Sequence, residues 1–259
     1  MEYFVYHFQV FMLIMMRLNA MMVVAPFYSS AMIPFRIKAL ISFLVTLVIF
    51  PMVAARGLKI PPDMGGYTLL VINEVSIGLI IGFIVSVIFA AFQLSGQYFA
   101  VQIGFGINEV LDPLGQVSIP LVGQLKNLVG LLVFIAINGH HFLIEAIYRS
   151  YELAPVMSLK RSMIGGIVKY VMYSFSGMFV VALKIALPVV ATIFLISVSM
   201  GVLAKVAPQM NIMMLGFPFK IMVAFGVLLL ITPLIVKIMQ VSLERVFVFI
   251  TRVLQHWPI

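Results

Sequence analysis

The segment Val75–Asn108, VSIGLIIGFIVSVIFAAFQLSGQYFAVQIGFGIN, contains no Asp, Glu, Lys or Arg. About 20 consecutive apolar residues let a helix cross the roughly 30 Å hydrocarbon layer of a bilayer, so this segment is long enough to span it. Small residues recur along it at helical spacing, which lets a neighbouring backbone approach one helix face closely. They are Gly78, Gly82, Ser86, Ala90, Gly96 and Ala100, followed by Gly104. The segment therefore predicts a membrane helix that packs tightly on other helices.

Composition places the whole chain in the same class. Hydrophobic residues make up 64% of the 259 residues and charged residues 9%. A soluble domain has about 45–50% apolar and about 25% charged residues. The net charge of +8 is spread over helix ends, which is typical of membrane flanks and not of a nucleic-acid-binding surface. We expect one helical membrane unit, or two closely packed halves, and no nucleic-acid partner.

Apolar runs separated by turn-forming residues define the expected helices. Those helices are Phe8–Tyr28, Ala39–Ala55, Tyr67–Gln102, Leu121–Phe142, Tyr170–Leu203 and Met213–Val236. Residues 104–120 form an expected loop or broken segment, and the tail 237–259 is amphipathic and basic. The most polar stretch, Arg149–Lys169, is expected to be a loop and the boundary between two halves.

Charge placement argues against a simple serpentine topology. The basic segments Arg36–Lys38 and Arg149–Lys169 both resemble cytoplasmic loops, yet counting the crossings between them puts them on opposite sides. Arg17, Lys184 and Lys220 lie inside apolar runs. Because a basic residue costs about 2.5–3.5 kcal/mol at a bilayer centre, we expect these three to be buried charges or interface charges. Either one run is a re-entrant hairpin, or the protein does not sit in lipid in the ordinary way.

His140, His141 and Glu145 form the one site-like cluster in the sequence. Their spacing lacks the His-Glu-x-x-His pattern of a zinc-protease helix, and no Walker or Gly-x-Ser-x-Gly pattern is present. Cysteine is absent, so neither a thiolate ligand nor a Cys nucleophile is available. We expect no catalytic residues, no cofactor and no metal. A membrane enzyme would require this cluster to bind a metal ion.

One motif carries a family resemblance. It consists of Ala207, Pro208, Gln209, Met210 and Asn211, followed by Gly216-Phe217-Pro218 and Lys220. This motif resembles the FliR family of the flagellar type III export gate, whose injectisome counterpart is the SctT family. Further matching patches, in the expected order, are Gln102–Phe105, Asp112-Pro113, Gly139–His141, Ser150 and Pro155.

The resemblance implies a non-enzymatic subunit of a protein-export channel in the bacterial inner (cytoplasmic) membrane, within the flagellar basal body. It implies an all-α membrane protein of tilted helical hairpins. A FliP-like part over residues 1–160 would be fused to a FliQ-like hairpin over residues 161–259. The implied partners are FliP-like and FliQ-like subunits in a helical pore complex, further export-apparatus membrane proteins, and unfolded exported polypeptides.

The resemblance also implies that the loop after the long helix plugs the pore, at about residues 104–120. The residues that would act there are Gly104, Phe105, Gly106, Ile107, Val110, Leu111, Asp112 and Pro113. Its glycines permit sharp bends, and its apolar side chains suit a constriction that excludes water.

Two alternative functions stay open. The chain could serve an injectisome instead of a flagellum, although Gly216-Phe217-Pro218 is more typical of the flagellar family. It could also be a secondary transporter or a small-solute channel, because broken helices and charges within the membrane are shared with transporters. A transporter would be stable and active by itself, whereas an export-gate subunit needs partners.

Overall fold

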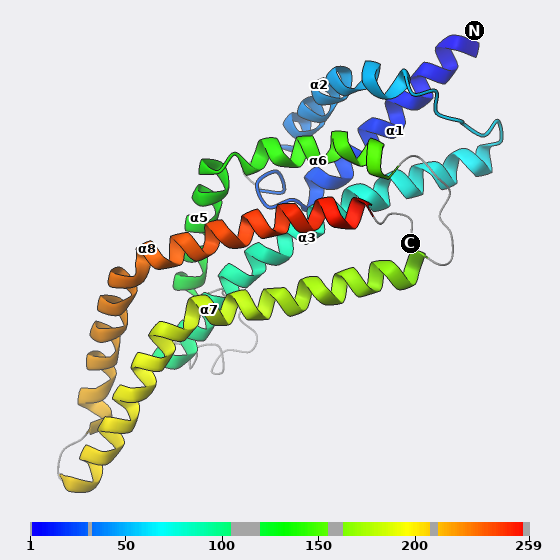
Figure 1. Cartoon of the computed structure of the whole chain (residues 1–259). Coiled ribbons are helices and arrows are strands. Elements are labelled where there is room, and N and C mark those ends of the chain that lie inside the picture. Colours follow the sequence, from blue (N-terminus) through cyan, green and yellow to red (C-terminus); the bar gives the residue numbers. More distant parts are fainter. Residues whose placement is uncertain (1, 31–32, 105–119, 155–162, 208–211, 256–259) are drawn as a thin grey trace, which may run out of the picture. The chain divides into compact units, whose positions relative to one another are not determined.

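The computed structural model describes residues 2–30, 33–104, 120–154, 163–207 and 212–255 (Figure 1). Every element of regular secondary structure in these ranges is an α-helix, which confirms the expected all-α membrane fold. They are α1 (Glu2–Val24), α2 (Phe35–Ala54), α3 (Met64–Ile103), α5 (Leu121–Ala136), α6 (Gly139–Leu153), α7 (Met163–Val206) and α8 (Ile212–Gln255). By length and composition, five described helices could cross a membrane, and α5 with α6 would make a sixth span if counted together.

The helix expected from the uncharged segment is α3, which begins three residues before the predicted start and ends one residue after the predicted end. Gly104 follows it with φ of 101°, a conformation that side-chain-bearing residues rarely adopt. Its backbone N–H donates to the Ala100 carbonyl oxygen at 3.2 Å. Glycine at this position therefore allows the chain to leave the helix axis immediately after Ile103.

The prediction of one continuous helix over Leu121–Phe142 is wrong. Helices α5 and α6 are separate, and their axes differ in direction by 65°. Asn138 lies between them with φ of 58° and ψ of 32°, a left-handed conformation that Asn tolerates better than most residues. A β-carbon at Gly139 would collide with the Phe134 ring. The Asn138-Gly139 pair thus permits a bend that the continuous apolar pattern does not reveal.

The prediction of a polar loop over Arg149–Lys169 is also partly wrong. Helix α6 continues to Leu153 and α7 begins at Met163. Arg149 pairs with Glu145 one turn earlier at 2.7 Å, so its charge is satisfied along the helix surface. Similarly, the last apolar run and the basic tail form one helix, α8, which passes through Pro218 and Pro233.

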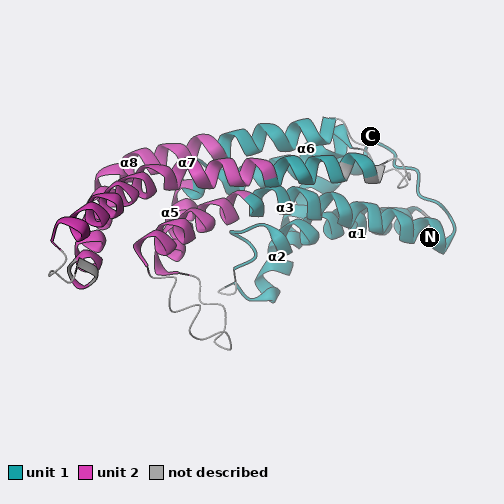
Figure 2. Ribbon diagram, turned by 90° about the horizontal axis from the view of Figure 1, so that it is seen from below, with its two compact units in different colours: residues 1–87, 134–175, 243–259 teal, residues 88–133, 176–242 magenta. Residues whose placement is uncertain are grey.

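The chain divides into two compact units that alternate along the sequence (Figure 2). The first comprises residues 1–87, 134–175 and 243–259, and the second comprises residues 88–133 and 176–242. Within the first, the Phe11 ring of α1 lies 5.5 Å from the Phe43 ring of α2, between centroids. The Phe142 ring of α6 stacks on Phe247 of α8 at 4.0 Å. Within the first unit, aromatic contacts therefore pack α2 on α1 and the last part of α8 on α6.

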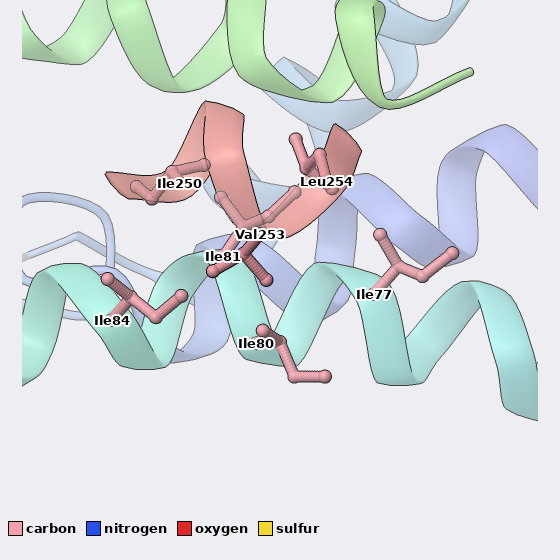
Figure 3. Close-up of a pocket in the computed structure, with 7 residues that line it drawn as sticks. All are labelled: Ile77, Ile80, Ile81, Ile84, Ile250, Val253 and Leu254. Atoms are coloured by element: carbon pink, nitrogen blue, oxygen red, sulfur yellow. The ribbon is translucent and has the colours of Figure 1, made fainter. Parts of the chain in front are cut away.

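A small hollow in the first unit lies between α3 and the last turns of α8 (Figure 3). Aliphatic side chains alone line it: Ile77, Ile80, Ile81, Ile84, Ile250, Val253 and Leu254. Ligand sites usually combine an apolar wall with a few placed polar groups. Because this hollow has none, we assign it to helix packing.

Candidate functional site

The main polar feature of the first unit is a buried ion pair between α1 and α3. Arg17 and Glu74 are both fully buried. The Arg17 Nε donates to Glu74 Oε2 at 2.7 Å, and Arg17 Nη2 donates to Glu74 Oε1 at 2.7 Å. This two-pronged arrangement matches the planar guanidinium to the planar carboxylate, which is the strongest geometry available to such a pair.

Two residues of α6 complete the cluster. Arg17 Nη1 donates to the Ser150 hydroxyl oxygen at 2.6 Å, and the Tyr151 hydroxyl donates to Glu74 Oε2 at 3.0 Å. The guanidinium carbon of Arg17 also lies 3.8 Å from the centroid of the Tyr151 ring. Arg17, Glu74, Ser150 and Tyr151 therefore form one polar cluster, hereafter the Arg17 cluster, that ties α1, α3 and α6 together.

The chemistry of the Arg17 cluster fits a role in stabilising the fold. Its carboxylate accepts from three donors, and its arginine stays charged, so it contains neither a free base nor a nucleophile activated by one. Charges removed from water are tolerated only when they are paired and hydrogen-bonded. The cluster therefore fixes which faces of three helices meet.

Sequence reasoning anticipated only part of this cluster. Arg17 was expected to be buried or at an interface, and it is buried within the chain itself. Glu74 and Tyr151 were missed. A usable signal was present, because an arginine inside an apolar run needs a carboxylate, and Glu74 lies in the apolar helix α3 directly before the uncharged segment.

Two further buried polar residues were also missed as sites. Asn73 is fully buried beside Glu74, and its amide finds no hydrogen-bond partner within the described ranges. In the second unit, Lys126 of α5 is only 2% exposed, and its Nζ donates to the Ser95 carbonyl oxygen at 3.2 Å. The same Nζ lies 5.8 Å from the centroid of the Phe99 ring, so an aromatic face helps to stabilise this cation.

Three glycines in the uncharged part of α3 contact other helices, each within its own unit. A β-carbon at Gly78 would collide with the Arg17 carbonyl oxygen, and one at Gly82 would lie 2.8 Å from the Met21 carbonyl oxygen. A β-carbon at Gly96 would collide with the backbone of Gly123 in α5. These contacts support the predicted packing role of all three glycines.

The other small residues of α3 show a mixed environment. Ala100 is buried, Ser86 is half-buried and Ala90 is exposed. The Ser86 hydroxyl donates to the Phe83 carbonyl oxygen at 2.8 Å, within its own helix. A role for these three in helix packing stays a prediction.

The two other charges singled out in the sequence lie elsewhere. Lys184 of α7 is exposed and Lys220 of α8 is half-buried. Within the described part of the chain, neither lies at ion-pair distance from a carboxylate. An interface role for both lysines stays a prediction.

Most of the expected plug and family motif lies outside the described residues. Gly104 and Ala207 are described, and Ala207 donates its N–H to the Leu203 carbonyl oxygen at 2.9 Å at the end of α7. The plug residues outside the described ranges are Phe105, Gly106, Ile107, Val110, Leu111, Asp112 and Pro113. The motif residues outside them are Pro208, Gln209, Met210 and Asn211.

The histidine pair shows no assembled metal site. His140 and His141 have ring centroids 4.1 Å apart, but the nearby Glu145 carboxylate pairs with Arg149. No group of three or more His, Asp or Glu side chains within the described ranges is placed to hold a metal ion.

Replacing Glu74 tests the Arg17 cluster. Glu74→Gln leaves the Arg17 cation buried without a counter-charge, which should destabilise the chain by about 3–5 kcal/mol. The measurement is protease resistance of the chain in native membranes over a temperature series. Arg17→Met/Glu74→Leu, which removes both charges, should recover part of the loss. Arg56→Gln is the control, because its pair with Glu152 is partly exposed and should matter by about 1 kcal/mol or less. Equal stability of Glu74→Gln and Arg56→Gln would contradict the assignment.

Replacing Gly78 tests the close contact between α3 and α1. Gly78→Ala places a methyl group against a backbone carbonyl, so the helices must separate, and Gly78→Leu should be worse. Gly165→Ala in the first turn of α7 is the control, since no atom lies within 4 Å of a β-carbon there. Ala is a better helix former than Gly by about 1 kcal/mol, so the control should be neutral or stabilising. If Gly78→Leu is as resistant to protease as the wild-type chain in the same assay, the contact between α3 and α1 does not contribute to stability.

Comparisons with known proteins agree along the length of the chain. The family described as "Bacterial export proteins, family 1" matches residues 8–246. The flagellar biosynthetic protein FliR of Bacillus subtilis (strain 168) is 31% identical over 228 residues, covering 86% of this chain and 85% of that protein. FliR of Escherichia coli (strain K12) is 24% identical over 248 residues, covering 95% and 92%. FliR of Aquifex aeolicus is 26% identical over 222 residues, covering 86% and 84%. This chain therefore belongs to family 1 of the bacterial export proteins.

Proposed function

We propose that this chain is a non-enzymatic subunit of the flagellar type III protein-export gate in the bacterial inner membrane. With FliP-like and FliQ-like partners and further export-apparatus membrane proteins, it forms the channel through which unfolded flagellar subunits leave the cytoplasm. The observation that carries the proposal is the similarity to the three FliR proteins named above, which are 24–31% identical and each cover at least 86% of this chain. Those relatives carry flagellar names, so we favour the flagellum over an injectisome.

The exposed helix faces support a subunit that is completed by partners. Only 17% of the apolar window of α8 and 28% of that of α7 are buried inside the chain, compared with 61% for α3. Gly177, Gly201 and Gly226 on α7 and α8 have no atom within 4 Å of a β-carbon position. Open glycines on apolar helices let the backbone of a partner helix approach closely. A transporter that works by itself would also expose apolar faces to lipid, but it would not require open glycines on them.

We also propose that the chain comprises a FliP-like part over residues 1–160 and a FliQ-like hairpin over residues 161–259. The hairpin assignment is supported by α7 and α8, which are both 44 residues long and follow one another directly along the chain. The segment 104–120 would act as the plug of the resting pore. Gly104, with its positive φ, gives the chain a turn at the start of that segment.

Obligate assembly tests the proposed function. The tagged chain, extracted from membranes that also contain the FliP-like and FliQ-like proteins, should migrate as one large complex. Without those proteins it should aggregate or be degraded, because its apolar faces stay uncovered. Gly226→Leu should lower recovery of the complex, whereas Leu230→Ile, which preserves volume at an exposed site of the same helix, should not. A stable monomer that never joins these proteins would rule out the gate function.

Partial deletion of residues 104–120 tests the plug. The deleted complex should still assemble but should admit ions or a small dye, because the constriction that excludes water is lost. The measurement is dye uptake in cells with the intact or the shortened segment, at matched amounts of complex. An assembled deletion complex that is no leakier than wild type would mean that another segment seals the pore.

A further inference from the structure

Helix α2 has its two hydroxyl side chains inward and most of its large apolar side chains outward. Ser42 and Thr46 are fully buried, with hydroxyl groups that donate to Met22 Sδ at 3.3 Å and to the Ser42 carbonyl oxygen at 2.6 Å. The side chains that point away from the chain are each at least 47% exposed: Phe35, Leu40, Leu44, Leu47, Val48 and Met52. This distribution is the reverse of that on a helix at the surface of a soluble protein.

The residue types on this face favour lipid over a partner helix. Contacts between membrane helices are rich in small residues, as where Gly78 of α3 meets α1. Helix α2 contains no glycine, and its outward face presents long, branched or aromatic side chains. Such a face fills space against acyl chains and prevents close approach by another backbone.

Length and charge place α2 across a bilayer. Its 20 residues rise about 1.5 Å each, which gives about 30 Å, the thickness of the hydrocarbon layer. Arg36 and Lys38 lie in its first turn, and Arg56 follows its other end. Glu152 pairs with Arg56 at 2.8 Å, whereas no carboxylate in the described ranges lies at ion-pair distance from Arg36 or Lys38. The positive charge at the start of α2 is therefore uncompensated where headgroups would begin.

We propose that the outward face of α2 is a lipid-contact surface. Acyl chains pack against its central side chains, including Leu44 and Val48, and anionic phospholipid headgroups lie beside Arg36 and Lys38. The inference concerns α2 alone and holds whether or not the chain functions in export.

Site-directed spin labelling tests the acyl-chain contact. The chain contains no cysteine, so each single-cysteine variant carries one label. Val48→Cys and Leu44→Cys report on the face, Ile49→Cys reports on the packed interior, and Lys59→Cys reports on water. In native membranes, labels at positions 48 and 44 should collide with oxygen severalfold more often than the label at 49. They should also collide severalfold less often with a water-soluble nickel chelate than the label at 59.

Two outcomes of this measurement would overturn the proposal. Low collision rates with both reagents, as at position 49, would mean that a protein covers the face. High collision rates with the nickel chelate would mean that the face lies in water. If Ile49→Cys fails to fold, oxygen and nickel rates at positions 48 and 59 still separate lipid from water, and low rates with both reagents still indicate protein.

Headgroup binding needs a second measurement. The full-length chain, extracted from native membranes with whatever proteins remain bound to it, is placed in bilayers of equal phosphatidylglycerol and phosphatidylcholine, and retained lipid is identified by mass spectrometry. Arg36→Gln should lose part of the retained phosphatidylglycerol, whereas Arg56→Gln, which removes one charge that is already paired, should resemble wild type. Retention by Arg36→Gln equal to that of wild type, or an equal loss in both variants, would overturn the headgroup assignment.

Discussion

The ion pair between Arg17 and Glu74 constrains the first unit more than any other contact described. Both charges are fully buried, and every oxygen of the Glu74 carboxylate is engaged. A misplaced helix would leave a charge without its partner in an apolar environment, which is strongly unfavourable. The pair therefore selects one arrangement of α1, α3 and α6, while the abundant apolar contacts around it are far less selective.

Close helix packing and ion pairing coincide at the same residue. The side chain of Arg17 binds Glu74, and its backbone carbonyl lies against Gly78, one turn farther along α3. Without a β-carbon at Gly78, α1 can come near enough for the short guanidinium–carboxylate bonds to form. A larger residue there would strain both features together, so the glycine and the ion pair depend on each other.

The two kinds of outward surface differ in a way that fits their proposed neighbours. Open glycines on α7 and α8 suit the close approach of partner helices, as an export-gate subunit requires. The bulky face of α2 suits acyl chains. One chain can therefore contact both protein partners and lipid through helices of similar hydropathy, and side-chain size distinguishes the two.

The sequence by itself determined the fold class, the long helix α3 and the family, because apolar run length, missing charges and a specific motif are local properties. It did not determine the break at Asn138, since one left-handed residue leaves the apolar pattern unchanged. It also did not show that Arg17, Glu74 and Tyr151 meet, because Glu74 is 57 residues from Arg17 along the chain and Tyr151 is 77 residues from Glu74. Such partners are chosen by how whole helices pack, and only the tertiary structure contains that information.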